Sequence, residues 1–244
     1  MEKMNRILAI ALTLAFLFGL CAFSGCGDAE KKIVQQNQSP TVPDGEDDAQ
    51  SQSLFDGQTL NGWERVEFGG EGDVEIIDST IHMYAGDPLT AICVSDETEL
   101  PTRNYELSLE AMILEGSDFF ASVTFPVEDS FCTLVVGGWG GSLVGLSTLD
   151  GRDASENETR VLKSFDKEVW YAIRIQVMEN RIVAWIDDEK LVDQPTKDVE
   201  VSIRNDVIST TPLGIMNYGT SSACLLYTSP SPRDATLSRM PSSA

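Results

Sequence analysis

YELSLEAMI, residues 105–113, carries apolar side chains at every second position, with Glu106 and Glu110 between them. Because side chains along a β-strand point to opposite faces in turn, this period of two predicts a strand with one buried face. YAIRIQV, residues 171–177, repeats the pattern with Arg174 and Gln176 on the polar side. The two segments therefore predict sheet structure around a hydrophobic core.

Further short apolar runs follow one another along the chain, separated by Gly, Asp, Asn and Pro, and no stretch of useful length has helical periodicity. These runs are VEIID, IHMYA, AICVS, FFASVTF, FCTLVV, LVGLSTL, RVLKSF, RIVAWI, KLVD, VEVSI and LGIMNY. About a dozen short strands with such punctuation predict an all-β sandwich. Residues 53–223 have a length that suits one domain.

Residues 1–25 have the organisation of an export signal, with a basic start, an apolar run over residues 7–20 and the sequence FSG before Cys26. A cysteine at this place predicts a lipobox, with cleavage before Cys26 and acylation that tethers the mature protein to a membrane. The alternative is an uncleaved transmembrane anchor, because residues 7–25 carry no charge. The lipobox predicts a bacterial envelope lipoprotein, facing the periplasm or the cell surface.

Residues 26–52 are rich in Asp, Glu, Gln, Ser and Pro and contain hardly any large apolar side chains. Such a segment cannot bury enough surface to order itself. It predicts a disordered tether between the lipid anchor and the folded domain.

CLLYTSPSPRDATLSRMPSSA, residues 224–244, resembles the in-frame translation of a sequencing-library adapter. The alternative is a genuine Ser/Pro-rich disordered tail. On the first interpretation the natural chain is interrupted at about Ala223, and the sandwich is C-terminally truncated by one strand. We then expect the tail either to lie loose or to let ACLLYTS, residues 223–229, occupy the vacant strand position.

The chain is strongly acidic, with 39 Asp and Glu against 17 Lys and Arg and a net charge of −22. Binding of nucleic acid needs a basic surface, so a nucleic-acid partner is excluded. His82 is the only histidine, which excludes a multi-histidine metal site and favours a half-exposed structural residue. Cys93 and Cys132 lie in strand-like runs, where they either form a disulfide or are buried separately.

SLFDGQTLNGWE, residues 53–64, resembles the opening of the 3-keto-disaccharide hydrolase domain family. Residues 170–193 are similar to the late hairpin of that family, and PLGIMNYGT, residues 212–220, is similar to its penultimate signature. The resemblance implies a concanavalin A-like jelly roll and action on 3-keto-disaccharides or glycosides. Residues 116–159 depart from the family pattern, so no family catalytic residue is carried over.

GGWGG, residues 137–141, places Trp139 among four glycines. Glycines of this kind expose a ring on which a sugar can stack, or they form a sharp bend while the ring fills the core. Trp63, Trp170 and Trp185 lie inside the family motifs and favour core positions.

A polar loop follows the LVGLSTL run. Its charged and amide residues are Asp150, Arg152, Asp153, Glu156, Asn157 and Glu158. These side chains are of the kind that bind sugar hydroxyls or calcium, or that supply the acid and base of glycoside cleavage, although the spacing is not that of an EF-hand. The alternative is a solvated acidic turn. Asp150 and Asp153 are the catalytic candidates, while Trp139, Arg152, Glu156 and Asn157 are the candidates for substrate binding.

Three functions remain open at this point. The first is an envelope-tethered hydrolase acting on (3-keto-)disaccharides or glycosides, and the second is a non-catalytic carbohydrate-binding domain. The third is an envelope interaction domain without a sugar ligand. Carbohydrate is the expected partner of the first two, and the membrane is reached through the lipid on Cys26.

Overall fold

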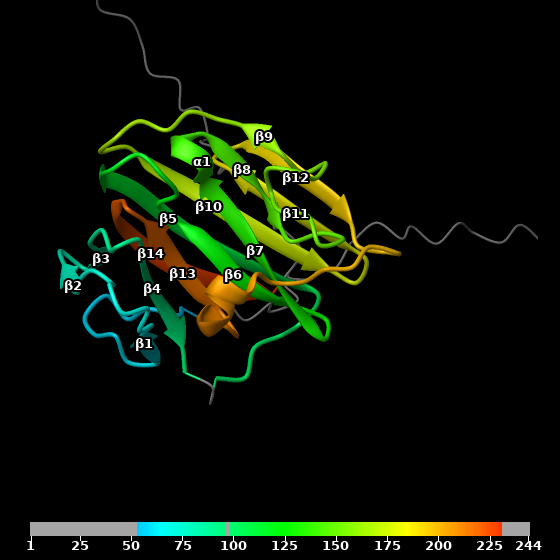
Figure 1. Ribbon diagram of the computed structural model, residues 1–244. Helices are drawn as coiled ribbons and strands as arrows, with labels where there is room; N and C mark the ends of the chain where they lie inside the picture. The colour runs from blue at the N-terminus through cyan, green and yellow to red at the C-terminus, as the bar shows by residue number, and fades with distance from the viewer. Residues whose placement is uncertain (1–52, 96–97, 231–244) are drawn as a thin grey trace, which may run out of the picture. The chain divides into compact units, whose positions relative to one another are not determined.

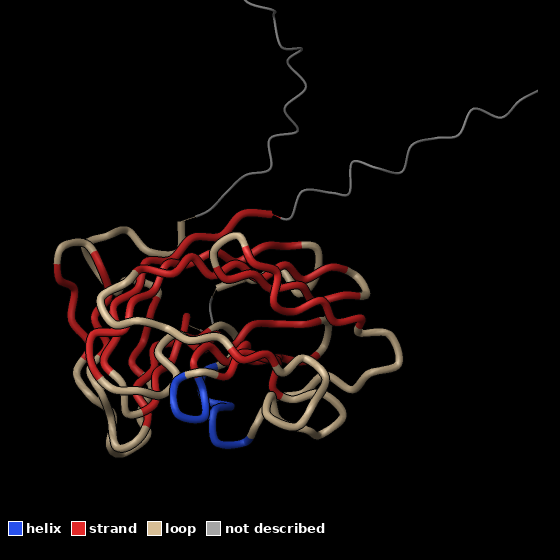
Figure 2. The backbone as a smooth tube through the Cα atoms, turned by 90° about the horizontal axis from the view of Figure 1, so that it is seen from above, coloured by secondary structure: helices blue, strands red, loops and turns tan. Residues whose placement is uncertain are grey.

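The computed structural model describes residues 53–95 and 98–230 as a sandwich of two sheets (Figure 1). The predicted signal sequence, Cys26 and the tether lie outside the described residues, as do residues 231–244. Figure 2 shows the two layers of strands edge-on. The prediction of an all-β sandwich is confirmed.

Each layer is a seven-stranded sheet in which all neighbouring strands are antiparallel. We name the first layer sheet A, and its strands in spatial order are β12 (Glu189–Pro195), β11 (Arg181–Ile186), β10 (Trp170–Met178), β5 (Tyr105–Glu115), β14 (Ser221–Pro230), β3 (Thr80–Met83) and β2 (Val74–Ile77). We name the second layer sheet B, and its strands are β1 (Trp63–Arg65), β4 (Leu89–Val94), β13 (Gly214–Tyr218), β6 (Ser122–Val127), β7 (Ser130–Gly137), β8 (Leu143–Ser147) and β9 (Val161–Leu162).

Two short helices, α1 (Gly138–Gly141) and the 3-10 helix η1 (Asn205–Thr210), complete the secondary structure of the described residues. Both lie on the outer side of one sheet (Figure 2). No helix in residues 53–95 and 98–230 is long and apolar enough to cross a membrane.

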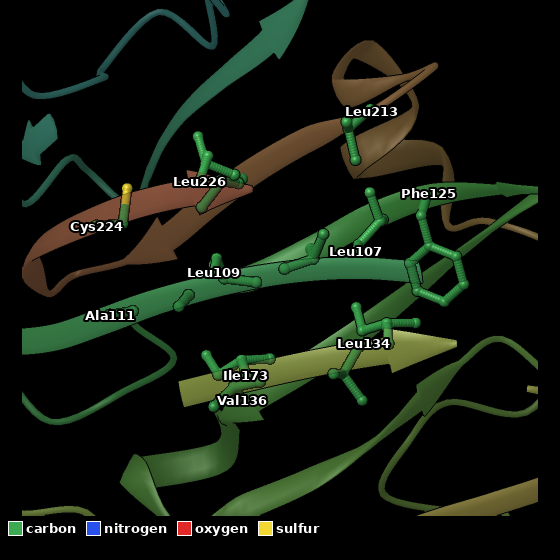
Figure 3. Packing of buried hydrophobic residues seen from close by; sticks show 14 of the residues in the cluster. Leu107, Leu109, Ala111, Phe125, Leu134, Val136, Ile173, Leu213, Cys224 and Leu226 are labelled. Carbon is green, nitrogen blue, oxygen red and sulfur yellow. The ribbon is translucent and has the colours of Figure 1, made fainter. Parts of the chain in front are cut away.

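The hydrophobic core lies between the sheets and is built by the alternating patterns. On β5, Leu107 and Leu109 are buried, and they pair with Ile175 and Ile173 of β10. Figure 3 shows side chains of sheet A approaching Phe125, Leu134 and Val136 of sheet B, which are fully buried.

Tyr105 connects the two layers, because its hydroxyl donates a hydrogen bond to the carbonyl oxygen of Pro126 on β6. Burial raises the pKa of Tyr105 well above its ordinary value. The hydroxyl therefore stays protonated as a donor at any physiological pH.

Strand β14 lies in sheet A between β5 and β3 and pairs with β5 from Ser221 to Pro230. Cys224 pairs with Ala111 and Leu226 pairs with Leu109, so both side chains enter the core (Figure 3). Burial raises the pKa of the Cys224 thiol to about 12. We expected the tail either to lie loose or to occupy a vacant strand position. The strand position is occupied, because ACLLYTS, residues 223–229, forms part of a central strand.

The sequence prediction of a strand at VEVSI, residues 199–203, is wrong. In this segment only Val201 forms a bridge, with Leu149. The segment is instead held beside the loop after β8 by backbone hydrogen bonds between Thr148 and Ser202, at 2.8 and 3.1 Å.

Cys93 and Cys132 do not form a disulfide. Cys132 points into the core with its neighbours on β7, whereas Cys93 packs on the outer face of sheet B with Val66 and Met216. A disulfide requires the two Cβ atoms to approach within about 4.5 Å, which opposite faces of a sheet prevent. Burial raises the pKa of the Cys132 thiol to about 12.

Candidate functional site

A pocket of about 310 Å³ opens on the outer face of sheet B. The inward positions of β6, β7 and β8 carry core side chains, so the alternate positions face outward and line the pocket. Three of these outward residues carry buried hydroxyls, namely Ser122, Thr133 and Ser147. The remaining lining residues are Leu89, Asp118, Phe119, Val135, Trp139, Arg204, Asp206, Val207, Met216 and Tyr218.

Trp139 stands at the rim of the pocket with 50% of its surface exposed. It lies in the turn between β7 and β8, where Gly141 has φ +99° and a Cβ would lie only 2.8 Å from the carbonyl oxygen of Ser117. Glycine at position 141 is therefore required for the turn to approach the loop before β6. Of the two alternatives for Trp139, the exposed ring is found.

Asp118 fixes this turn from the neighbouring loop. Its Oδ2 accepts a hydrogen bond from the N–H of Gly140 at 3.1 Å, and its Oδ1 accepts one from the N–H of Phe119 at 2.8 Å. One carboxylate thus connects the Trp139 turn to the backbone that carries Phe119.

Tyr218 forms a second aromatic wall at the end of β13, with 43% of its surface exposed. Its ring centroid lies 5.5 Å from that of Phe119, and its N–H donates to the carbonyl oxygen of Phe119 at 3.0 Å. Trp139, Phe119 and Tyr218 therefore give the pocket an aromatic lining from three separate segments.

Arg204 is the only cation among the described residues that line the pocket. Its Nε and Nη2 donate to the two oxygens of Asp206, both at 2.9 Å, and its Nη1 donates to Asp153 Oδ2 at 2.6 Å. Hydrogen bonds from Arg204 lower the pKa of Asp206, and the same contacts raise the pKa of Arg204. Arg204 and Asp206 are therefore ionised together at neutral pH.

Asp153, one of the two predicted catalytic residues, lies directly behind the pocket wall. Besides the guanidinium of Arg204, its Oδ1 accepts a hydrogen bond from the hydroxyl of Ser147 at 3.3 Å. Ser147 and Arg204, which contact Asp153, line the same pocket as Trp139. Asp153 and Trp139 therefore lie on the same face of sheet B.

Asp150, the other catalytic candidate, does not line the pocket. Its Oδ1 accepts a hydrogen bond from the N–H of Glu200 at 2.9 Å, which holds the loop after β8 against the segment before η1. Glu156 lies in the same loop, where its N–H donates to the carbonyl oxygen of Asp153 at 2.8 Å, and it does not line the pocket either.

The two remaining loop candidates, Arg152 and Asn157, have partners within the loop. Arg152 pairs with Glu158 at 3.3 Å on the surface. Asn157 is buried, and its amide donates to the carbonyl oxygens of Leu146 and Arg152 while its Oδ1 accepts from the N–H and hydroxyl of Thr159. Asn157 therefore organises the loop.

Asp118, Arg204, Asp206 and Tyr218 were not predicted as site residues from the sequence. Arg204 and Asp206 carry a weak signal, because opposite charges two residues apart follow the apolar run VEVSI. Tyr218 lies at the end of the LGIMNY run, where an aromatic residue can equally be core. Among residues 53–95 and 98–230, no group of three or more His, Cys, Asp or Glu side chains is placed to hold a metal ion.

The other three tryptophans lie away from the pocket. Trp63 is buried and donates its indole N–H to the carbonyl oxygen of Leu54 at 2.7 Å, which agrees with the core prediction. Trp170 is 39% exposed on β10, so the core prediction is wrong for it. Trp185, on β11, is half-buried beneath Arg174, whose guanidinium carbon lies 3.8 Å from the ring centroid.

Comparison with solved structures finds similar folds at low sequence identity. The Crh5 transglycosylase in complex with NAG is 11% identical over 75% of this chain and 84% of its own, with a TM-score of 0.51. A prokaryotic β-1,3-1,4-glucanase (lichenase) derived from a mouse hindgut metagenome is 9% identical over 75% and 98%, with a TM-score of 0.48. The carbohydrate binding module CBM66 from Bacillus subtilis is 12% identical over 67% and 92%, with a TM-score of 0.46. At such identities a match shows the fold alone.

No curated protein matches the sequence. The model of one protein family, described as the 3-keto-alpha-glucoside-1,2-lyase-like domain, matches residues 50–223, which is most of the chain. This match contains every residue that lines the pocket. The chain belongs to the 3-keto-alpha-glucoside-1,2-lyase-like domain family.

Proposed function

We propose that this domain binds a short glycan, such as a disaccharide or the end of a glycoside, in the pocket on the outer face of sheet B. The observation that carries the proposal is the position of Trp139, whose half-exposed ring stands at the rim of a cavity with a hydroxyl-bearing floor. A sugar ring has apolar C–H faces that pack on aromatic rings and hydroxyls at its edge that need hydrogen-bond partners.

The lining of the pocket supports this proposal. Phe119, Trp139 and Tyr218 supply apolar surface, while Ser122, Thr133 and Ser147 supply hydroxyls at the base. A cavity of about 310 Å³ lies at the small end of ligand pockets, which suits one or two sugar rings. The family to which the chain belongs is named for action on a glucoside, which agrees with a sugar ligand.

Turnover of a 3-keto-glucoside is the second candidate, and the family match over residues 50–223 favours it. The hydrogen bonds that the carboxylates near the pocket make within the protein favour binding of a sugar over its hydrolysis. A general acid for glycoside cleavage needs a raised pKa, whereas the pKa of Asp206 is lowered by Arg204. Asp153 uses both oxygens as acceptors from Ser147 and Arg204.

Glycan binding is tested by calorimetry with a panel of neutral and charged disaccharides, using wild type, Trp139→Ala and Trp185→Ala. We expect Trp139→Ala to weaken binding at least tenfold, which corresponds to about 1.4 kcal/mol. Trp185→Ala removes an equal ring from sheet A and is expected to leave affinity unchanged. Equal loss in both variants, or no binding of any glycan to the wild type, would contradict the proposal and favour an interaction domain without a sugar ligand.

Turnover is tested by incubating the protein with 3-keto-trehalose and following release of the products by mass spectrometry. Turnover that disappears in Asp153→Asn and persists in Asp150→Asn would establish an enzyme that uses Asp153. Binding without turnover would establish the carbohydrate-binding domain.

We also propose that the protein is a lipoprotein of a bacterial cell envelope, attached through acylated Cys26. The support is the order of a basic start, an apolar run and a cysteine in residues 1–26. Mass spectrometry of the mature N-terminal peptide tests the proposal, and we expect diacyl or triacyl modification on Cys26. An unmodified Cys26 within an uncleaved chain would establish the transmembrane anchor instead.

A further inference from the structure

We infer that the pocket selects a glycan that carries a free amino group and excludes acidic glycans. The inference rests on the proposed glycan binding and adds the chemical class of the ligand. Three independent features of the pocket point to a ligand that is positively charged and donates hydrogen bonds.

The first feature is the charge of the pocket. Asp118 and Asp206 line it, Asp153 lies behind them, and Arg204 is the only cation among the described lining residues. Arg204 commits three of its five N–H groups to Asp153 and Asp206, so its charge is already more than balanced. An anionic sugar that enters meets an excess of negative charge, whereas an ammonium group reduces that excess.

The second feature is the acceptor character of polar groups at the pocket. Ser147, one of the hydroxyls at its base, donates its single proton to Asp153 Oδ1 at 3.3 Å. The oxygen of Ser147 therefore has only lone pairs to offer to a ligand.

Ser147 therefore acts as an acceptor at the base of the pocket, and the carboxylates of Asp118 and Asp206 are acceptors by nature. A ligand that satisfies this surface must supply donors. An ammonium group supplies three, whereas a carboxylate or sulfate supplies none.

The third feature is the aromatic rim. The faces of Trp139 and Tyr218 carry negative quadrupole charge, which attracts a cation that lies over them. Both rings are half exposed at the pocket. This attraction adds to stacking and strengthens the binding of a protonated amino sugar. The same ring faces repel the charge of an acidic sugar and weaken its binding.

The test compares three β-1,4-linked disaccharides at pH 6 by calorimetry, namely the glucosamine dimer, cellobiose and cellobiuronic acid. We expect the wild type to bind the glucosamine dimer roughly tenfold more tightly than cellobiose and cellobiuronic acid more weakly than either, as a screened unit charge at a pocket wall predicts. The preference should shrink as salt is added. Tighter binding of cellobiuronic acid would overturn the inference while glycan binding stands.

Asp206→Asn is the informative variant, because it removes one negative charge and leaves Arg204 one acceptor oxygen at position 206 in place of two. We expect it to lose the preference for the glucosamine dimer and to bind cellobiuronic acid roughly three- to tenfold more tightly than wild type does. Glu106→Gln is the matched control, since it removes the same charge from sheet A, where Glu106 pairs with Arg174. An unchanged preference in Asp206→Asn, or the same change in Glu106→Gln, contradicts the inference. If none of the three disaccharides binds but another glycan of the panel does, the inference alone fails, and if no glycan binds, it fails together with the proposed function.

Discussion

The outer faces of sheets A and B both carry a tryptophan beside charged residues, but the two rings have different surroundings. On sheet A the face of Trp185 is covered by Arg174, which also pairs with Glu106 at 3.2 Å. On sheet B the ring of Trp139 projects from a glycine-rich turn, and the nearby Arg204 is held by Asp153 and Asp206 instead. The comparison teaches that exposure of an aromatic ring identifies a binding site only when no side chain of the same protein uses its face.

The two sheets also differ in where their strands come from. Every strand of sheet B lies within the residues that the family model matches, whereas β14 of sheet A extends from Ser221 to Pro230, beyond the match at 223. We therefore treat sheet B as the functional layer and sheet A as the layer whose integrity depends on residues 224–230.

The largest effect is expected from ending the chain after Ala223. This removes residues 224–230 of β14 and leaves β5 unpaired on one side from Ala111 to Tyr105, while β3 keeps only its pairs with Ser222 and Ala223. Because a central strand buries one face in the core and pairs on both edges, we expect no cooperative unfolding transition by circular dichroism. A chain that ends after Pro230 is the control and should unfold like the full chain; equal stability of the two truncations would contradict the dependence of sheet A on β14.

The next effect concerns the turn that exposes Trp139. Gly141→Ala places a methyl group 2.8 Å from the carbonyl oxygen of Ser117 at φ +99°, so we expect a loss of about 2–3 kcal/mol in the free energy of unfolding and weaker glycan binding. Gly140→Ala is the matched control, because φ is also positive there but the space around it is open. We expect a cost of about 1 kcal/mol from Gly140→Ala in denaturant unfolding. A cost as large as that of Gly141→Ala would mean that φ alone, and not the contact, governs the turn.

A smaller effect is expected from uncovering the ring on sheet A. Arg174→Ala removes a partly exposed ion pair and a cation–π contact, which together stabilise the fold by about 1 kcal/mol. Thermal unfolding measures this loss. Calorimetry with the same disaccharides should show no new site, because Trp185 does not line the pocket on sheet B. A gain of sugar binding would show that an open ring suffices, and would break the comparison.

The smallest effect concerns pH. The pKa of Asp206 is lowered by Arg204, and the pKa of Asp193 on sheet A is lowered by Lys190 and Arg181. Each ion pair therefore makes its full contribution to the free energy of unfolding above the ordinary Asp pKa of about 4. This contribution is lost as the pH falls through the lowered pKa of the carboxyl in the folded state. We expect both carboxyls to titrate below about pH 4 by NMR. The affinity for cellobiose, which carries no ionisable group, should stay constant from pH 7 to pH 5 and fall only as Asp206 is protonated. Affinity that instead follows the titration of Asp193 would contradict the assignment of the pocket to sheet B.

The alternation of side chains was enough to predict the sandwich, because YELSLEAMI and YAIRIQV have one apolar and one polar face. It failed at VEVSI, whose short alternation is that of a strand but whose backbone pairs only at Val201. Local pattern does not reveal whether a neighbouring strand is present to accept the hydrogen bonds.

The candidate site could be predicted only in part. Trp139 and Asp153 were found because glycines and clustered carboxylates are visible in sequence, whereas Asp150 from the same cluster lies against Glu200. Arg204 and Tyr218 were missed because they come from segments more than 50 residues away from Asp153, and the sheet brings them together. A pocket on a sheet surface is defined by strand order, which side-chain pattern does not encode.

The pairing of β14 with β5 determines which changes of sequence this strand tolerates. The ladder from Ser221 to Pro230 is made by backbone groups, and the core asks only that small or apolar side chains stand at positions such as 224 and 226. Any extended peptide that places small or apolar side chains at these positions meets this requirement. Substitutions along β14 that keep this face apolar are therefore expected to preserve the ladder, at a distance from the pocket on the other layer.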